Sequence, residues 1–75
     1  MTPAQSRAAR GLVSMTQTEL AKAAALGQST VIDFERERRR VSGEAVAAIR
    51  AALEAAGVIF LPENGNGPGV ALKKV

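Results

Sequence analysis

The sequence has no cysteine and no histidine among its 75 residues. Their absence excludes disulfide bonds, a thiolate nucleophile and a zinc site built from the usual cysteine and histidine ligands. A chain of this length has room for one domain, and folding buries only about 60% of the surface that the unfolded chain exposes. Because neither a disulfide nor a metal can add to that marginal core, we expect self-association to contribute to stability.

Long apolar runs and catalytic clusters are missing as well. No apolar run approaches the roughly 18 residues of a membrane span, and no basic and then apolar leader begins the chain, which predicts a cytoplasmic protein. The carboxylates are scattered, and the glycine-rich segment 65–69 is not followed by the helix that a phosphate cradle requires, so it is better explained as a turn. We therefore expect no enzymatic activity and no metal, cofactor or small-molecule ligand.

Positive charge is concentrated in one short segment. Ten basic and seven acidic residues leave a net charge of +3, and four of the ten cations are Arg36, Arg38, Arg39 and Arg40. Two interpretations are open from the charges alone. Cations are favoured at a helix C-terminus, where neighbouring glutamates can pair with them, and a run of arginines can also contact phosphates.

Cap residues and apolar spacing predict a mainly α fold of four helices. Thr2 and Ser42 are suited to be N-caps, and Thr16 with Glu19 forms a capping box. Gly57 is suited to end the last helix. The predicted helices cover residues 3–13, 17–25, about 28–37 and 43–56.

The segment 58–75 differs from the helical part. Two short apolar runs, 58–61 and 70–72, flank turn-forming residues, which predicts a C-terminal β-hairpin. Strand alternation places one set of side chains against the helices: Val58, Phe60, Val70 and Leu72. The other set forms an open apolar face: Ile59, Leu61 and Ala71. Because an open edge beside such a face invites pairing, we expect residues 58–75 to join two copies, following a helical domain over residues 1–57.

Two short helices joined by a tight turn indicate a helix-turn-helix unit. Its packing requires a small residue at Ala21 and apolar residues at Leu26 and Val31. The stretch MTQTELAKAAALGQSTVIDFERERRR, residues 15–40, resembles the Cro/cI-type (XRE, lambda-repressor-like) helix-turn-helix family, and the resemblance extends from about residue 8 to residue 49. Ala25 stands where many members have glycine, which suggests a slightly tighter or less left-handed turn, and Gly27 stands where many have a Ser or Thr cap.

The resemblance implies that the third helix lies in the DNA major groove. By position, the base-reading set is Gln28, Ser29, Ile32 and Asp33, in which Asp33 could accept a hydrogen bond from cytosine N4. The phosphate-contacting set is Gln17, Thr30, Arg36, Arg38, Arg39 and Arg40. The resemblance also implies that Gln17 braces Gln28, and that Arg10 and Glu35 form a partly buried structural ion pair.

The function expected from these residues is sequence-specific binding of double-stranded DNA by a small transcriptional repressor. One recognition helix reads too few base pairs to select a site, so we expect a homodimer on a two-fold symmetric site. The alternative is a protein-interaction module, such as an antitoxin that binds a partner protein through its β tail. A regulatory protein partner fits either function.

Overall fold

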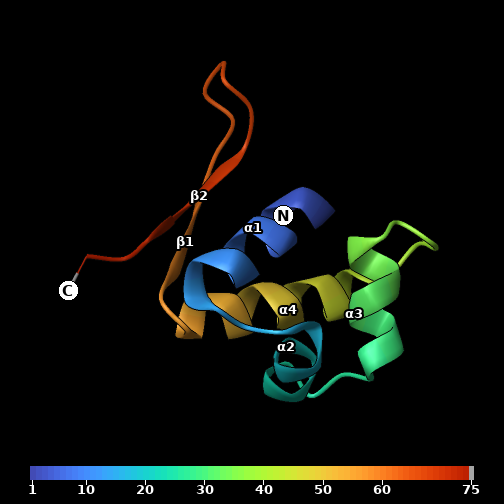
Figure 1. Cartoon of the computed structure of the whole chain (residues 1–75). Helices are drawn as coiled ribbons and strands as arrows, with labels where there is room; N and C mark the ends of the chain where they lie inside the picture. Colours follow the sequence, from blue (N-terminus) through green and yellow to red (C-terminus); the bar gives the residue numbers. More distant parts are fainter. Residues whose placement is uncertain (75) are drawn as a thin grey trace.

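The predicted mainly α fold with a C-terminal hairpin is confirmed by the computed structural model, which describes residues 1–74 (Figure 1). Val75, the last residue of the predicted tail, lies outside the described residues. The elements in chain order are α1 (Pro3–Val13), α2 (Gln17–Ala23), α3 (Gln28–Glu35), α4 (Gly43–Ala55), β1 (Val58–Leu61) and β2 (Gly69–Leu72). Within residues 1–74, no helix has the length and apolar character needed to cross a membrane.

The first two helices begin with reciprocal side-chain caps. The Thr2 hydroxyl accepts from the Gln5 amide, and the Gln5 side chain accepts from the Thr2 amide. Thr16 and Glu19 form the same pair of bonds at the start of α2, at 2.9 and 3.0 Å. Each box satisfies two backbone donors that a helix otherwise leaves without partners. The box at Thr2 depends on a glutamine, and the sequence indicated only its threonine cap.

Three helices are followed, within one or two residues, by a left-handed residue that is not glycine: Ser14 (φ 54°), Ala25 (φ 56°) and Glu37 (φ 55°). After α2, the Leu26 amide donates to the Ala21 carbonyl at 2.9 Å and the Ala25 amide donates to the Lys22 carbonyl at 3.2 Å. These two bonds form a Schellman turn, which requires a left-handed residue at its centre. The expectation that Ala25 makes the turn less left-handed is therefore wrong, and α2 ends two residues earlier than predicted.

All four helices and the first strand contribute to one core. Leu20, Val31, Ile49 and Leu53 are fully buried, and Val58 of β1 is 3% exposed. The same cluster contains Ala9 and Ala21, whose small side chains let the helices approach, and the aromatic ring of Phe34. Because β1 supplies Val58, the hairpin is packed against the helices and is part of the apolar core of this small domain.

The hairpin is antiparallel, with Val58 opposite Leu72 and Phe60 opposite Val70. Phe60 and Val70 pack against the core as expected, and the Gln5 side chain donates to the Gly69 carbonyl at 3.0 Å. Leu72, however, is 51% exposed. The expectation that it packs on the helices is wrong, because the end of β2 extends beyond the helices (Figure 1).

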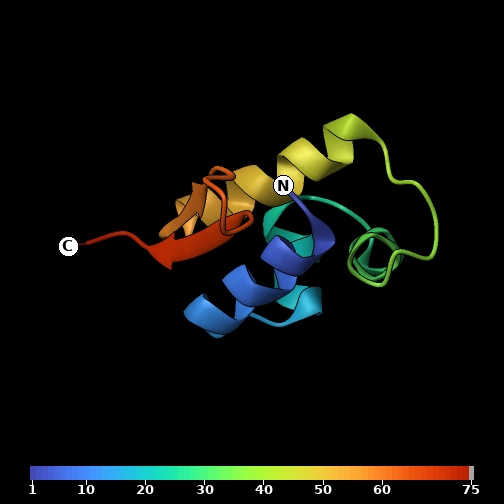
Figure 2. The same cartoon turned by 90° about the horizontal axis from the view of Figure 1, so that it is seen from above.

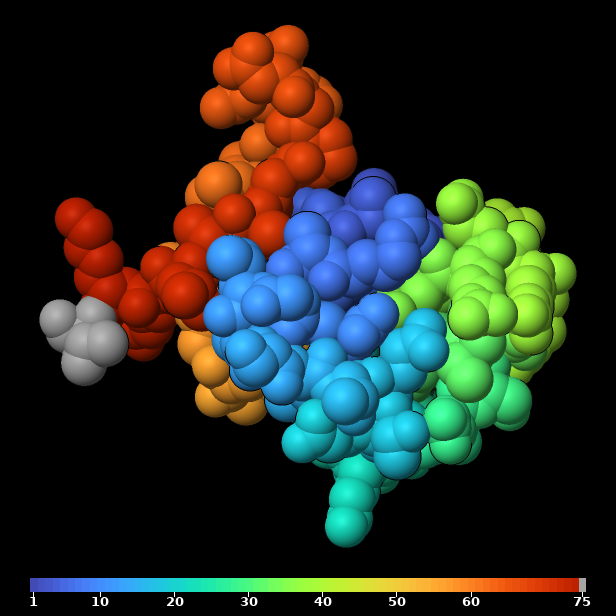
Figure 3. Space-filling model, viewed as in Figure 1, coloured from blue at the N-terminus to red at the C-terminus, as the bar shows by residue number. Residues whose placement is uncertain are grey.

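The hairpin and α3 lie at opposite ends of the molecule. The two views of the ribbon, at right angles to each other, both place the hairpin on the left and α3 on the right (Figures 1 and 2). The space-filling view shows the loop of the hairpin projecting beyond the helical body (Figure 3). Glu63 closes this loop by accepting from the amides of Gly65 and Gly67 at 2.7 and 2.8 Å.

The left-handed alanine gives a test of the turn between α2 and α3. Ala25→Gly should raise the free energy of unfolding by about 0.5–1 kcal/mol, because relief of the left-handed strain exceeds the entropy that glycine adds to the unfolded chain. In a domain of this size that is a rise in Tm of about 2–8 °C, measurable by thermal circular dichroism. Ala23→Gly, at an exposed right-handed helical position, is the matched control and should lower Tm. Equal losses in both variants would contradict the left-handed turn.

Candidate nucleic-acid interface

The recognition helix predicted from the sequence has one buried and one outward face. Val31, Phe34 and Glu35 of α3 are buried against the other helices. Gln28 and Ser29, at the N-terminal end of α3, are exposed. Thr30, Ile32 and Asp33 are half-buried. The helix ends at Glu35, two residues before the predicted end, because the chain turns at Glu37.

A fully buried carboxylate, that of Glu35, joins α3 to α1 and α2. The Arg10 Nε atom lies 3.0 and 2.9 Å from the two carboxylate oxygens, and Arg10 Nη2 lies 2.8 Å from Oε1. Ser6 Oγ donates to Oε2, and Gln17 Nε2 donates to Oε1 at 3.1 Å. The ion pair implied by the resemblance is thus part of a network of four side chains.

The network keeps Glu35 ionised. Burial by itself raises the pKa of this carboxyl group, but hydrogen bonds from Arg10, Ser6 and Gln17, together with the positive charge of Arg10, outweigh burial and hold the pKa below its ordinary value. Within the described residues, no buried side-chain nitrogen or oxygen atom lacks a hydrogen-bond partner. A charge buried in this way is tolerated because each of its oxygen atoms has donors.

Gln17, at the first position of α2, has a different contact from the expected one. Its amide group donates to Glu35, so it braces α3 through the buried carboxylate and not through Gln28. Its side chain is half-buried at the N-terminus of a helix. Backbone donors and the helix dipole favour an anion at such an end.

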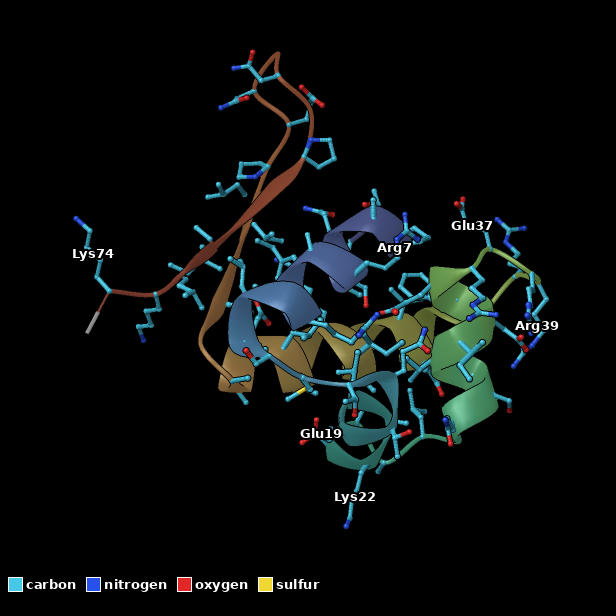
Figure 4. All side chains as sticks on the ribbon, in the orientation of Figure 1. Arg7, Glu19, Lys22, Glu37, Arg39 and Lys74 are labelled. Atoms are coloured by element: carbon cyan, nitrogen blue, oxygen red, sulfur yellow. The ribbon has the colours of Figure 1, made fainter. Side chains whose placement is uncertain are left out.

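The four arginines of residues 36–40 are all exposed and lie beyond the end of α3. Arg36 is the first residue after the helix, and the others follow in the loop toward Ser42, which caps α4. Arg39 points away from the helical body on the outer side of α3 (Figure 4). Its Nε atom lies 2.8 Å from Oδ2 of Asp33, so two residues predicted for separate roles are in contact.

Three further polar residues of this region were not identified from the sequence. Ser6 lies one helical turn before Arg10, a spacing that places both on one face of α1 and could have indicated a shared partner. Arg7 donates to the backbone carbonyl of Glu35 and so gives a hydrogen-bond partner to a carbonyl group at the C-terminal end of α3. Lys22 projects from α2 into solvent (Figure 4). In the part of the chain that the structure describes, acidic residues do not gather into a group that could hold a metal ion.

Two short helices joined by a Schellman turn, with the second exposing its polar N-terminal end, define a helix-turn-helix DNA-binding protein. The Helix-turn-helix family model HTH_3 matches residues 7–56, two thirds of the chain. The chain therefore belongs to the helix-turn-helix family of Cro/cI-type DNA-binding transcriptional regulators. No curated protein matches it.

The buried carboxylate predicts a pH dependence of stability. Because the pKa of Glu35 is lower in the folded than in the unfolded chain, its contribution is complete above about pH 4.5 and is lost as the pH falls through the folded value. Glu35→Gln should cost up to about 3–5 kcal/mol at pH 7, since the partly buried Arg10 is left without a charged partner. The same change should flatten the curve of stability against pH below about pH 5. Urea midpoints measured across this range test both effects.

The control for this experiment is Glu54→Gln, which neutralises an exposed carboxylate in an ion pair with Arg50. Exposed pairs contribute about 0–1 kcal/mol, so this variant should follow the wild-type curve closely. A Glu35→Gln curve parallel to that of the wild type would mean that the pKa of Glu35 is the same in the folded and the unfolded chain.

Proposed function

We propose that the protein is a repressor that binds a specific double-stranded DNA site as a homodimer, with α3 in the major groove. The observation that carries the proposal is the exposure of Gln28 and Ser29 at the N-terminal end of α3, on a helix held in place by the buried Glu35. Helix-turn-helix proteins read base edges with these first residues of the second helix. An exposed but well-anchored helix end suits that purpose.

The outward residues have chemistry that suits base edges. Glutamine can bond an adenine through two atoms, and serine can bond either a base or a phosphate. Ile32 offers an apolar contact for a thymine methyl group, and Asp33 offers a carboxylate on the same face. We assign these four residues, Gln28, Ser29, Ile32 and Asp33, to the base-reading surface.

Phosphate contacts are assigned to the residues that flank α3. Arg36, Arg38 and Arg40 are exposed where the chain leaves the helix, and Gln17 and Thr30 lie near the starts of α2 and α3. Contacts of this kind position a protein on the duplex without reading its sequence. Lys22, exposed on α2, is added to this set.

The hairpin is proposed as the dimerisation element. Ile59 and Leu61 are 42% and 44% exposed, and Ala71 is opposite Ile59 on the same face of the sheet. Because the hairpin and α3 lie at opposite ends, a two-fold axis through the hairpin would place the two recognition helices at the outer ends of a dimer (Figure 2). In this arrangement residues 1–57 bind DNA and residues 58–75 join the copies, in the cytoplasm where the DNA lies.

The second candidate is a protein-interaction module, such as an antitoxin. It is supported by the same exposed apolar face, which a different protein could cover in place of a second copy. The two candidates differ in oligomeric state, since the antitoxin does not require a homodimer through Ile59 and Leu61.

DNA binding should separate the base-reading and phosphate-contacting residues. Gln28→Ala should cost about 1–3 kcal/mol on the preferred site and leave binding to random duplex DNA nearly unchanged. Arg40→Ala should weaken binding to both and reduce the slope of log affinity against log salt by about one. Fluorescence anisotropy with a selected site and a random duplex measures the affinity and its salt dependence. Equal losses on both duplexes for Gln28→Ala would remove it from the base-reading set.

Sedimentation should show whether the open face of the hairpin joins two copies. Ile59→Lys with Leu61→Lys should convert a dimer into a monomer that remains folded, because both side chains are exposed at the surface. Ala23→Lys, at an exposed position on α2, is the control for an added lysine away from the hairpin and should remain dimeric. Truncation after Gly57 is avoided because it removes the buried Val58. A wild-type monomer, or a dimer in all variants, would exclude this interface.

A further inference from the structure

The contact between Arg39 and Asp33 is maintained by the backbone as well as by the side chains. After α3 the chain turns at the left-handed Glu37, and the Arg38 amide donates to the Asp33 carbonyl at 2.9 Å. The next residue, Arg39, is therefore carried back toward the outer face of the helix. Its Nε atom donates to Asp33 Oδ2 at 2.8 Å. The loop after α3 is thus attached to the recognition helix beside its outward face.

This ion pair lies where DNA is proposed to bind. Asp33 is one helical turn after Ser29, on the same face of α3. The side chains of Asp33 and Arg39 are 22% and 52% exposed, and ion pairs that are this accessible to solvent contribute little to stability. An unpaired carboxylate at this position would repel phosphates, whereas the guanidinium neutralises it.

The geometry leaves the outer edge of the guanidinium free. An arginine side chain has five N–H donors in a rigid fork, and Nε supplies only one of them. Within residues 1–74, Asp33 is the one hydrogen-bond partner that the structure gives the Arg39 side chain. The Nη1 and Nη2 groups therefore keep donors available, while the bond to Asp33 restricts the rotation of an otherwise flexible side chain.

We propose that Asp33 and Arg39 act together as a guanine-reading unit. The free N–H groups of Arg39 donate to O6 and N7 of one guanine in each half-site, which is the pairing that an arginine fork matches best. Asp33 is a positioning residue that orients the fork, and it does not accept from cytosine. The proposal rests on the proposed DNA-binding function, and it replaces both the direct base contact assigned above to Asp33 and the phosphate contact expected for Arg39.

The test uses the full chain, a site selected from random duplexes, and duplexes with each base pair of that site replaced in turn. The wild type should prefer guanine at one position of each half-site by about 5- to 150-fold. Arg39→Ala and Arg39→Lys should abolish that preference, the second while keeping the wild-type salt slope. Asp33→Ala should reduce it at the same position, and the double variant should be no worse than Arg39→Ala alone.

Arg40→Ala is the matched control, since it removes a neighbouring exposed arginine and should weaken all duplexes alike. Circular dichroism checks that each variant is folded. We expect folding to be retained because the substituted side chains are exposed or half-buried. The proposal is overturned if Arg39→Ala weakens all duplexes equally, or if Asp33→Ala changes preference at a different base pair. A wild type with no sequence preference would overturn the proposed function itself, which distinguishes the two failures.

Discussion

The structure depends on one buried carboxylate that three helices share. Glu35 belongs to α3, while its partners Ser6 and Arg10 come from α1 and Gln17 comes from α2. Leaving a buried charge without its partner costs several kcal/mol, which is a large part of the stability of a 75-residue domain. The same contacts that stabilise the fold therefore determine the orientation of α3. Arg10 also donates to the Met15 carbonyl at 3.2 Å, which attaches the connection between α1 and α2 to this network.

Small size explains why so many elements share the core. The chain has few residues that can be fully buried, and the apolar cluster draws on every helix and on Val58 of the hairpin. The tight left-handed turns after α1, α2 and α3 shorten the connections and bring the helices into contact within a radius of gyration of 11.6 Å. The hairpin consequently stabilises the domain in addition to its proposed part in association. The open face with Ile59 and Leu61 remains available because strand alternation directs those side chains away from Val58.

Polar contacts near α3 show how the fold gives different contacts to side chains of the same chemical type. Four arginines occur within residues 36–40, and their chemistry is the same. Only the backbone turn at Glu37 decides that Arg39 is the one that reaches Asp33 at 2.8 Å. Arg10 and Arg39 both pair with a carboxylate, but Glu35 is completely buried and Asp33 is 22% exposed. The first pair therefore acts on stability, and the second is the pair that we propose to act on recognition.

The sequence by itself determined the class of the fold and the family, because these depend on local signals. Helix caps, apolar spacing and turn-forming residues are short-range features, so the four helices and the hairpin could be predicted from them. Contacts between distant residues could not be predicted in the same way. The bond from Gln17 to Glu35 spans 18 residues, and that from Ser6 to Glu35 spans 29. The left-handed conformation of Ala25 and the pairing of Arg39 with Asp33 belong to local turns that the residue types did not indicate. The exposure of Leu72 was decided only by tertiary structure, since it depends on where the end of the hairpin lies relative to the helices.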